Sequence, residues 1–552
     1  MTNIKCDLVK FVIEEHFGEV CAEIIHFIIK YGPSIISSII NHLNRNYNLR
    51  ACETKLYIGH LINHNLVNYN EKDVRVYYDV NVQSIFYLIR FSKYVYITRQ
   101  NFGKIAETII INILNLGRTD IVNLLATTYL KLKSKHDYFE IKDQLLKLIS
   151  HKLIRRIAWL ENEINLKDFQ LTPKLVYIEK FAYNIPKDFD FNNEIQNLKK
   201  LERSILDTNP TAKRLKLSHI YQTNKVYWMM NYEKLDSILV EQLISQALKI
   251  RYIEPYCNFC QLDISTNNYL NNVSQKIFNN LKNDYKDNGF LVFSLEDLIS
   301  SKIEDSLKDK YKNAIKQLLE YLATDSEYLN HGKIKEKEKI GWIYKLTDSS
   351  YKFYMDKSIH DIYAEFIFYF IKNKYGSKAA RIYNLIKHKK ACEQKKIEEL
   401  AMMPPKEVKE NVYTILNTGL INIQEVSKGT DFAPSRTFYL FKAASDNDSL
   451  QIMSNYCYKT FVNLMERCKS EQANGKNLFE KRDKLEAIIA NLPGPEVNSE
   501  YESQVNEIKA SFSPADLKTM NDITSSVDKL RSALFQLDEV ILIMEIHRHY
   551  IS

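Results

Sequence analysis

The sequence predicts a mainly α-helical fold in several domains. Glycine accounts for 13 and proline for 11 of the 552 residues, well below the roughly 7% and 5% of average proteins. Folds built from many short strands need frequent turns, so this scarcity argues against β-sandwiches, propellers and glycine-rich phosphate loops. Apolar residues recur at helical spacing along most of the chain, and at about 150 residues per domain its length predicts three or four folded units.

Composition and charge narrow the class of protein. Hydrophobic residues make up 45% and charged residues 26% of the chain, with a net charge of +8, which is typical of a folded globular protein. The eight cysteines are too sparse for a disulfide scaffold. The single C-x-x-C pair, Cys257 and Cys260, has no second pair nearby, so we expect a reducing compartment, no metal and no cofactor. No segment approaches 18 uninterrupted apolar residues, which argues against membrane insertion.

The first 81 residues combine helices with a hairpin. Apolar residues at helical spacing predict helices over 4–17, 19–31, 34–43 and 51–65. The period then changes to two on both sides of a charged tip, which predicts paired strands from Leu66 to Tyr78. Helices followed by a hairpin form a winged helix-turn-helix, so residues 1–81 are expected to fold as one winged helix.

The same order of elements returns three more times, over residues 82–159, 226–356 and 357–445. The expected helices are 82–91, 104–114, 119–130 and 138–150 in the second unit, 235–251, 269–281, 295–303 and 311–323 in the third, and 359–375, 377–387, 394–402 and 406–417 in the fourth. Strands are expected at 153–157, at 340–344 and as the pair 420–425 and 437–441. Residues 160–225 are more polar and contain three prolines, which predicts a linker.

Residues 446–552 predict two long helices. Apolar residues step by three and four from Met520 to Met544, which is the a/d seam of a coiled coil. The seam residues are Ile523, Val527, Leu530, Leu534, Leu537 and Ile541. Pro493-Gly-Pro495 lets the chain reverse, so an antiparallel coiled-coil hairpin is expected, with an ordinary packed helix pair as the alternative.

No catalytic constellation is present in the sequence. Phosphate-binding glycine loops, H-E-x-x-H and G-x-S-x-G are all missing, so we expect no catalytic residues and a binding function. A short basic cluster formed by Lys213, Arg214 and Lys216 follows Pro210 and resembles a nuclear localisation signal. Its alternative interpretation is a solvated linker.

Candidate DNA contacts are local. The segment 131–156 holds eight basic and three acidic residues and covers the last helix and strand of the second unit. The candidates there are Lys131, Lys133, Lys135, Lys152, Arg155 and Arg156, and a weaker pair is Lys333 and Lys335. A solvated charged face is the alternative for both groups. The third helices of the first and fourth units contain both Lys and Glu and are nearly neutral. We therefore expect them to contact protein partners and not the major groove of DNA.

The chain resembles a known family over most of its length. The resemblance is carried by Glu15-His-Phe-Gly-Glu19, Val226-Tyr-Trp228, Tyr375-Gly-Ser-Lys-Ala-Ala-Arg381, Ala433-Pro-Ser-Arg436-Thr-Phe-Tyr-Leu440 and Glu486-Ala-Ile-Ile-Ala490. These stretches are similar to the winged-helix subunit of eukaryotic RNA polymerase III, which belongs to an initiation heterotrimer and is related to the large subunit of TFIIE. Pro434, Ser435 and Arg436 are its signature in the last wing, where Arg436 is either functional or holds the wing loop through its carbonyls.

The resemblance implies a noncatalytic nuclear subunit on the clamp side of the RNA polymerase III core. It further implies a second winged-helix subunit and an acidic-tailed small subunit as partners, recruitment of TFIIIB, nonspecific contacts to duplex or melted DNA, and promoter opening at genes such as those for tRNA and 5S rRNA. The alternative is a free-standing tandem winged-helix transcription factor that binds a specific site. Such a factor would prefer its site over random DNA by about 4–10 kcal/mol.

Overall fold

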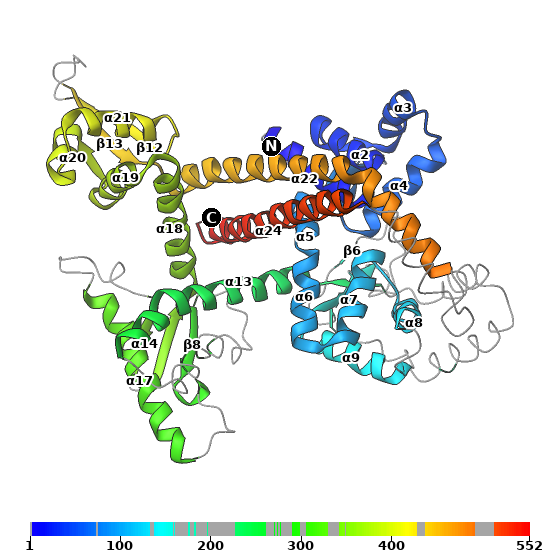
Figure 1. Ribbon diagram of the computed structural model, residues 1–552, viewed down its shortest axis with the longest axis horizontal. Helices are drawn as coiled ribbons and strands as arrows, with labels where there is room; N and C mark the ends of the chain where they lie inside the picture. Colours follow the sequence, from blue (N-terminus) through cyan, green and yellow to red (C-terminus); the bar gives the residue numbers. More distant parts are fainter. Residues whose placement is uncertain are drawn as a thin grey trace. The chain divides into compact units, whose positions relative to one another are not determined.

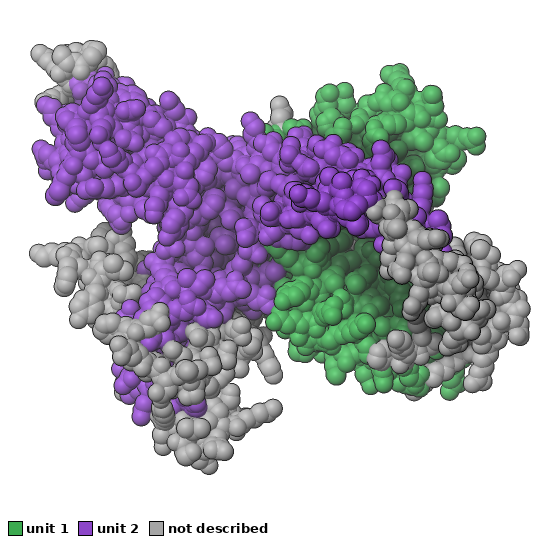
Figure 2. Space-filling model, in the orientation of Figure 1, with its two compact units in different colours: residues 1–238 green, residues 239–552 purple. Residues whose placement is uncertain are grey.

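The computed structural model confirms the mainly α fold and divides the chain into two compact units, residues 1–238 and 239–552 (Figures 1 and 2). The residues it describes are 3–72, 75–132, 137–157, 227–260, 290–298, 305–328, 342–347, 349–427, 437–491 and 513–551, with short pieces between 159 and 196 and between 270 and 277. Within these residues, no helix is both long and apolar enough to span a membrane.

The first winged helix has an additional helix in front of it. Its elements are α1 (Asn3–Phe17), α2 (Glu19–Tyr31), β1 (Ser34–Ile35), α3 (Ile36–Tyr47), α4 (Ala51–Asn63), β2 (Val67–Lys72) and β3 (Arg75–Val80). The three strands form a sheet in the order β1-β3-β2. The core consists of aliphatic residues from α1, α2, α3 and α4, such as Ile13, Ile25, Leu43 and Leu61, all of which are fully buried.

The second winged helix closes with a strand that lies far along the chain. Its elements are α5 (Val82–Ile89), α6 (Phe91–Phe102), α7 (Lys104–Leu116), α8 (Ile121–Lys131), α9 (Tyr138–Ser150), β4 (Ile154–Arg156) and β7 (Trp228–Met230). Strands β4 and β7 pair antiparallel, and Thr119 bridges to Trp228 in the place that β1 has in the first winged helix.

This pairing corrects the boundary expected between the second and third domains. We expected 226–356 to form the third winged helix, but Trp228–Met230 completes the sheet of the second, where Trp228 is 1% exposed. The physical reason is that β4 needs an antiparallel partner for its backbone, and β7 supplies it. Residues 160–225 are therefore an insertion in the wing of the second domain. Their described parts include β5 (Trp159–Leu160) paired with β6 (Leu175–Val176).

A recurring hydrogen bond joins each wing to the next helix. In three domains a residue with positive φ follows the third helix, namely Asn65, Lys152 and Gly419, and a buried leucine comes next. The carbonyl of that leucine accepts a hydrogen bond from the backbone N–H of the residue directly after the last strand. In the third domain the carbonyl of Trp342 accepts from Tyr354, the final residue of the last strand. The four N–H to carbonyl pairs are Asn81 to Leu66 (2.8 Å), Asn231 to Leu153 (2.8 Å), Tyr354 to Trp342 (2.8 Å) and Ala444 to Leu420 (2.9 Å).

Each last strand thus leads directly into the next helix. Asn81 caps α5 by accepting from the Ser84 N–H, and the hydroxyl of Ser445 accepts from the Asp448 N–H at the start of the last helical pair. Side-chain caps of this kind satisfy N–H groups that a helix start leaves without partners.

The third winged helix is described in part. Its elements are α13 (Tyr232–Leu248), η2 (Lys249–Ile253), α14 (Glu254–Cys260), β8 (Phe290–Ser294), η3 (Glu296–Leu298), α17 (Asp305–Tyr328), β9 (Ile343–Lys345) and β10 (Ser350–Tyr354). The sheet order is β8-β10-β9. Arg251 places its guanidinium 5.3 Å from the Trp342 ring and pairs with Glu365 at 2.8 Å.

The fourth winged helix and the helical hairpin follow. The domain contains α18 (Met355–Tyr375), α19 (Ser377–Lys389), β11 (Ala391–Glu393), α20 (Gln394–Ala401), α21 (Pro405–Leu416), β12 (Ile421–Ser427) and β13 (Thr437–Ala443), with sheet order β11-β13-β12. The hairpin consists of α22 (Asp446–Asn491) and α24 (Pro514–Ile551), which run antiparallel along each other in Figure 1.

The first two winged helices are joined through a tight contact at the end of α7. The Asn63 amide donates to the Leu116 carbonyl at 2.6 Å, and the Arg118 guanidinium donates to the Asn65 side chain at 3.2 Å. Gly117 has φ +73, and a Cβ there would lie 2.7 Å from the Asn63 carbonyl oxygen. Only glycine fits this position, because both the backbone angle and the close approach exclude a side chain.

Candidate functional site

We use the name basic edge for three candidate cations of the second winged helix, Lys131 at the end of α8, Lys152 after α9 and Arg155 in β4. Lys131 ends α8 and is exposed, and Lys152 is exposed at the left-handed turn, where its Nζ lies 6.0 Å from the Tyr183 ring. Arg155 in β4 is half-buried. These three cations lie at a helix end and in a wing, the places from which winged helices contact phosphates.

Arg156 does not share this exposure. It is 5% exposed, and its backbone N–H donates to the Ala182 carbonyl at 2.7 Å. A strand alternates its side chains, so Arg155 and Arg156 point to opposite faces, and the second of them is covered. The expectation that Arg156 contacts DNA is therefore corrected.

The other predicted contact and signal residues lie outside the described residues. They are Lys133, Lys135, Lys333 and Lys335 among the DNA candidates, Lys213, Arg214 and Lys216 in the nuclear-signal candidate, and Pro434, Ser435 and Arg436 in the last wing. Their roles remain predictions.

A buried ion pair fixes the start of α13 against α5 and α6. Arg90 is fully buried at the junction of α5 with α6, and its guanidinium donates to Asp236 at 2.9 Å. The Tyr94 hydroxyl donates to the other carboxylate oxygen of Asp236 at 2.6 Å. This pair was not predicted from the sequence. Its one local signal is a lone arginine inside the apolar run from Ile85 to Phe91.

Aromatic rings surround the same junction. The Tyr232 ring stacks on Tyr87 at 4.9 Å and on Phe91 at 6.0 Å between centroids. Burial raises the pKa of Tyr232 above its usual range, and the positive charge of Arg155 opposes this shift. The hydroxyl therefore stays protonated, and the cluster is an apolar anchor behind the basic edge.

Helix α18 connects the fourth winged helix with the hairpin. The Tyr363 hydroxyl and the Ser449 hydroxyl of α22 are 3.2 Å apart, and the Tyr363 ring lies 4.8 Å from the His547 ring of α24. His360 contacts the same imidazole at 5.2 Å between centroids. His547 is 2% exposed, and neither of its ring nitrogens has a hydrogen-bond partner among the residues that the structure describes.

We expect this histidine to make the hairpin base sensitive to acid. Burial, followed by the charge of His360, lowers the pKa of His547 from 6.5 to about 4. The unfolded chain then binds a proton more readily than the folded one, so His547 leaves stability intact above pH 6.5 and lowers it as the pH falls from 6.5 toward 4. The slope is at most about 1.4 kcal/mol per pH unit.

His547→Phe removes the proton-binding group and keeps an aromatic ring. The difference between variant and parent unfolding free energies in urea should be constant above pH 6.5 and should shift in favour of the variant below it. Parallel profiles for the two proteins would contradict the assignment.

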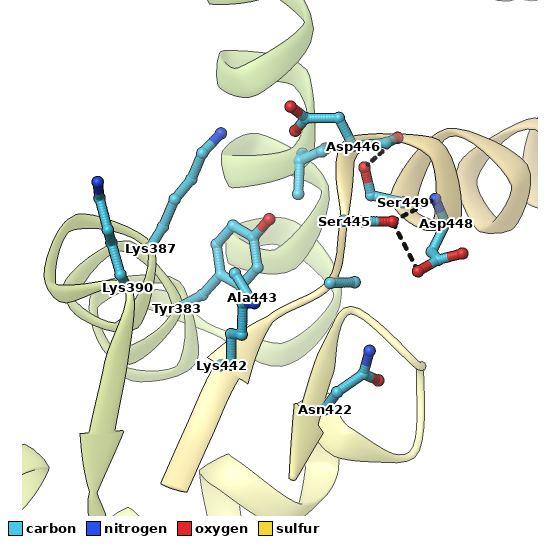
Figure 3. A pocket seen from close by; sticks show the side chains of 12 residues that line it. Tyr383, Lys387, Lys390, Asn422, Lys442, Ala443, Ser445, Asp446, Asp448 and Ser449 are labelled. Atoms are coloured by element: carbon cyan, nitrogen blue, oxygen red, sulfur yellow. Dashed lines mark hydrogen bonds between the residues drawn. The ribbon is translucent and has the colours of Figure 1, made fainter. Parts of the chain in front are cut away.

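A pocket of about 440 Å³ lies where β13 turns into α22 (Figure 3). Lys387, Lys390 and Lys442 line it on one side and Asp446 and Asp448 on the other. Burial lowers the pKa of Lys387, and the charge of Asp446 opposes this effect. Because its lining carries both positive and negative side chains, this pocket suits neither a free anion nor a free cation.

The predicted seam residues lie along α24 with graded burial. Val527 is 7% and Ile541 1% exposed, whereas Ile523, Leu530, Leu534 and Leu537 are half-buried. Gly475 of α22 sits so close that a Cβ would approach Ile523 to 3.2 Å. The hairpin is thus packed most tightly near its base, next to α18.

Among the described residues, no three His, Cys, Asp or Glu side chains gather as a metal site requires.

Three family models match the chain. The RNA polymerase III subunit RPC82 helix-turn-helix domain covers residues 7–72. The C-terminal winged-helix domain of POLR3C covers 367–443, and the helical hairpin domain of DNA-directed RNA polymerase III subunit RPC3 covers 477–543. The three ranges fall on the first winged helix, the fourth winged helix and the α22–α24 hairpin.

Curated proteins match over nearly the whole chain. DNA-directed RNA polymerase III subunit RPC3 of Homo sapiens is 26% identical over 579 residues, covering 99% of this chain and 98% of that protein. The Rattus norvegicus protein of the same name is 26% identical with the same coverage. That of Dictyostelium discoideum is 34% identical over 119 residues, 21% of this chain and 17% of that protein. With winged helices at both ends of the domain series and a helical hairpin in matching order, the chain is similar to the winged-helix RPC3 subunits of RNA polymerase III over nearly its whole length.

Proposed function

We propose that this chain works as a noncatalytic initiation scaffold of RNA polymerase III. The observation that supports this most directly is the match to RPC3 subunits over 99% of the chain and 98% of the relative. Its architecture agrees, because winged helices joined to a helical hairpin offer many docking faces. A free-standing transcription factor is not favoured by these relatives.

The scaffold is proposed to act at promoters of small noncoding RNA genes, by recruiting TFIIIB and helping to open DNA. Its proposed partners are the polymerase core on the clamp side, a second winged-helix subunit and an acidic-tailed small subunit. We propose that the chain works in the nucleus and that Lys213, Arg214 and Lys216 act as its import signal. The mixed charges of Lys406, Glu407, Lys409 and Glu410 on α21 support a protein-facing third helix.

The test is affinity purification of the endogenous chain from nuclear extract, followed by mass spectrometry and a nonspecific transcription assay. Recovery of active RNA polymerase III core supports the proposal. Recovery of the chain with chromatin and without polymerase subunits would replace it by the free-standing factor.

The second winged helix is proposed to guide DNA through phosphate contacts. Changing Lys131, Lys152 and Arg155 to serine should weaken binding equally for all sequences and lower the salt slope by about 0.9 per lost contact on duplex DNA. Serine at the exposed Lys459, Lys484 and Lys529 of the hairpin removes the same charge and serves as the control. A salt slope that stays at the parent value would remove this edge from the proposal.

A further inference from the structure

The fourth winged helix carries a concentrated basic surface. Residues 372–396 contain nine basic residues and one acid, Glu393, a local charge of +8 that equals the net charge of the whole chain. We name this surface the basic face. Its residues are Lys372, Lys374, Lys378, Arg381, Lys387, Lys389, Lys390, Lys395 and Lys396.

The basic face is open to solvent. Eight of its nine side chains are exposed and Lys387 is half-buried. Two members have acidic partners on the surface, Lys378 with Glu407 at 2.7 Å and Lys396 with Glu399 at 2.8 Å. Within the described part of the chain, Arg381, Lys389, Lys390 and Lys395 form no ion pair. Surface pairs contribute about 0–1 kcal/mol, so even the paired lysines can exchange partners.

The stabilising effect of cations at helix C-termini explains only part of the positive charge on the basic face. Cations in the last turn of a helix are favoured by its dipole, which accounts for Lys372 and Lys374 in α18 and for Lys387 and Lys389 in α19. Lys378, however, lies in the first turn of α19, and Lys395 and Lys396 lie in the first turn of α20. Positive charge is unfavourable at a helix start. Glu407 offsets Lys378 and Glu399 offsets Lys396, so Lys395 is the helix-start cation here that favours an external anion.

Aromatic rings lie among the cations. Lys372 Nζ is 5.8 Å from the ring centroid of Tyr369, whose side chain is 54% exposed. Lys374 Nζ is 4.5 Å from the Tyr456 ring and 5.3 Å from Phe370. Lysines that alternate with accessible rings favour a nucleic acid over an acidic peptide, because bases stack on aromatic faces while phosphates contact the cations.

The excess positive charge does not lie on α21, the helix that corresponds to the base-reading helix of winged-helix proteins. In α21, Lys406 and Lys409 are offset by Glu407 and Glu410. The basic face instead follows α18, α19 and the start of α20, and Lys387 and Lys390 extend from the end of α19 in Figure 3. This distribution fits backbone contacts without sequence reading.

We infer that the basic face of the fourth winged helix binds the sugar–phosphate backbone of a nucleic acid without base specificity. This contact is separate from the one proposed for the second winged helix. It depends on the cations of α18–α20 and on the exposed Tyr369 ring, and it does not require the chain to be a polymerase subunit.

The test uses the full chain and fluorescence anisotropy with labelled oligonucleotides of about 30 nucleotides, single-stranded or duplex, between about 50 and 200 mM salt. The variant changes Arg381, Lys389, Lys390 and Lys395 to serine, all of which are exposed and form no ion pair with a described residue. The control changes the exposed hairpin residues Lys459, Lys484, Lys518 and Lys529 to serine, which removes the same net charge. Circular dichroism checks that both remain folded.

The variant should lose at least about tenfold in affinity at the lower salt, with a salt slope reduced by about 0.7 per lost contact on single strands and about 0.9 on duplex. The control should stay within about twofold of the parent protein. Loss with one probe alone assigns the face to that form of nucleic acid, and loss with both assigns it to the backbone in general. Unchanged slopes with both probes, or equal losses in variant and control, would overturn the inference.

A second variant tests the stacking contact. Tyr369→Ala should lower single-strand affinity by about tenfold and leave duplex binding nearly unchanged. A glutamate-rich peptide is added as a competitor, which tests whether the basic face binds an acidic protein segment in place of a nucleic acid. If it displaces both oligonucleotides at equal charge concentration, the face is a protein-docking surface and the inference fails. Copurification with polymerase, measured separately, reports on the proposed function alone.

Discussion

Replacing Asp236 by alanine should destabilise unit 1 by about 3–5 kcal/mol. The substitution leaves the Arg90 guanidinium, which is fully buried, without the carboxylate that accepts its hydrogen bond at 2.9 Å. It also removes the acceptor of the Tyr94 hydroxyl. Urea unfolding with hydrogen exchange of α5 and α6 should show the loss, because both helices contact α13 through these residues.

Two controls separate the loss of the Asp236 carboxylate from lost packing. Arg90→Met combined with Asp236→Leu removes both charges and keeps apolar volume, so it should recover most of the stability that Asp236→Ala loses. Tyr94→Phe deletes one hydrogen bond and should cost about 1 kcal/mol. Equal destabilisation by the single and the double variant would mean that packing rather than charge dominates at this junction.

Placing an aspartate at Ile541 should separate the base of the hairpin. Ile541 is 1% exposed on α24, so the new carboxylate would be buried without a partner at a cost of several kcal/mol. Hydrogen exchange should rise in α24 and in the part of α22 that contains Met453. The exposed Gln536 offers the matched control, since Gln536→Asp adds the same charge at the surface of the same helix.

The half-buried part of the seam should respond less. Leu530→Asp with Leu537→Asp places two charges where side chains keep some contact with water, so each should cost less than the change at Ile541. If all these variants fold and assemble normally, the seam is not a buried interface.

The helices and the last wing could be predicted from the sequence because their signals are local. The apolar period of 3.6 over 377–387 and 406–417 gives α19 and α21 to within two residues. The alternation in 420–425 and 437–441 gives β12 and β13 for the same reason. The strands β1, β8 and β11 were missed, because two to five residues carry too little periodicity to stand out.

The partners of β4 could not be predicted, since strand pairing is not encoded locally. Nothing within 153–157 indicates that its partner begins at Trp228. For the same reason, a strand of three residues does not reveal which of Arg155 and Arg156 faces the core. The basic face was also missed, although its nine cations and single acid lie within 372–396 and a charge count along this segment would have found it. The exposure of these cations and their distances to aromatic rings come only from the fold.

The wing of the second domain encloses about 70 residues between β4 and β7, whereas the wing of the first encloses two. Loop-closure entropy grows by about 0.6 kcal/mol for each doubling of length, so the longer loop costs about 3 kcal/mol more to close. Burial of Trp228 and Met230, at 1% and 0% exposure, offsets this loss of chain freedom. A contact between residues so far apart in the sequence forms slowly. We therefore expect α5 to α9 to collapse first and the second sheet to be completed late, when the returning strand finds β4.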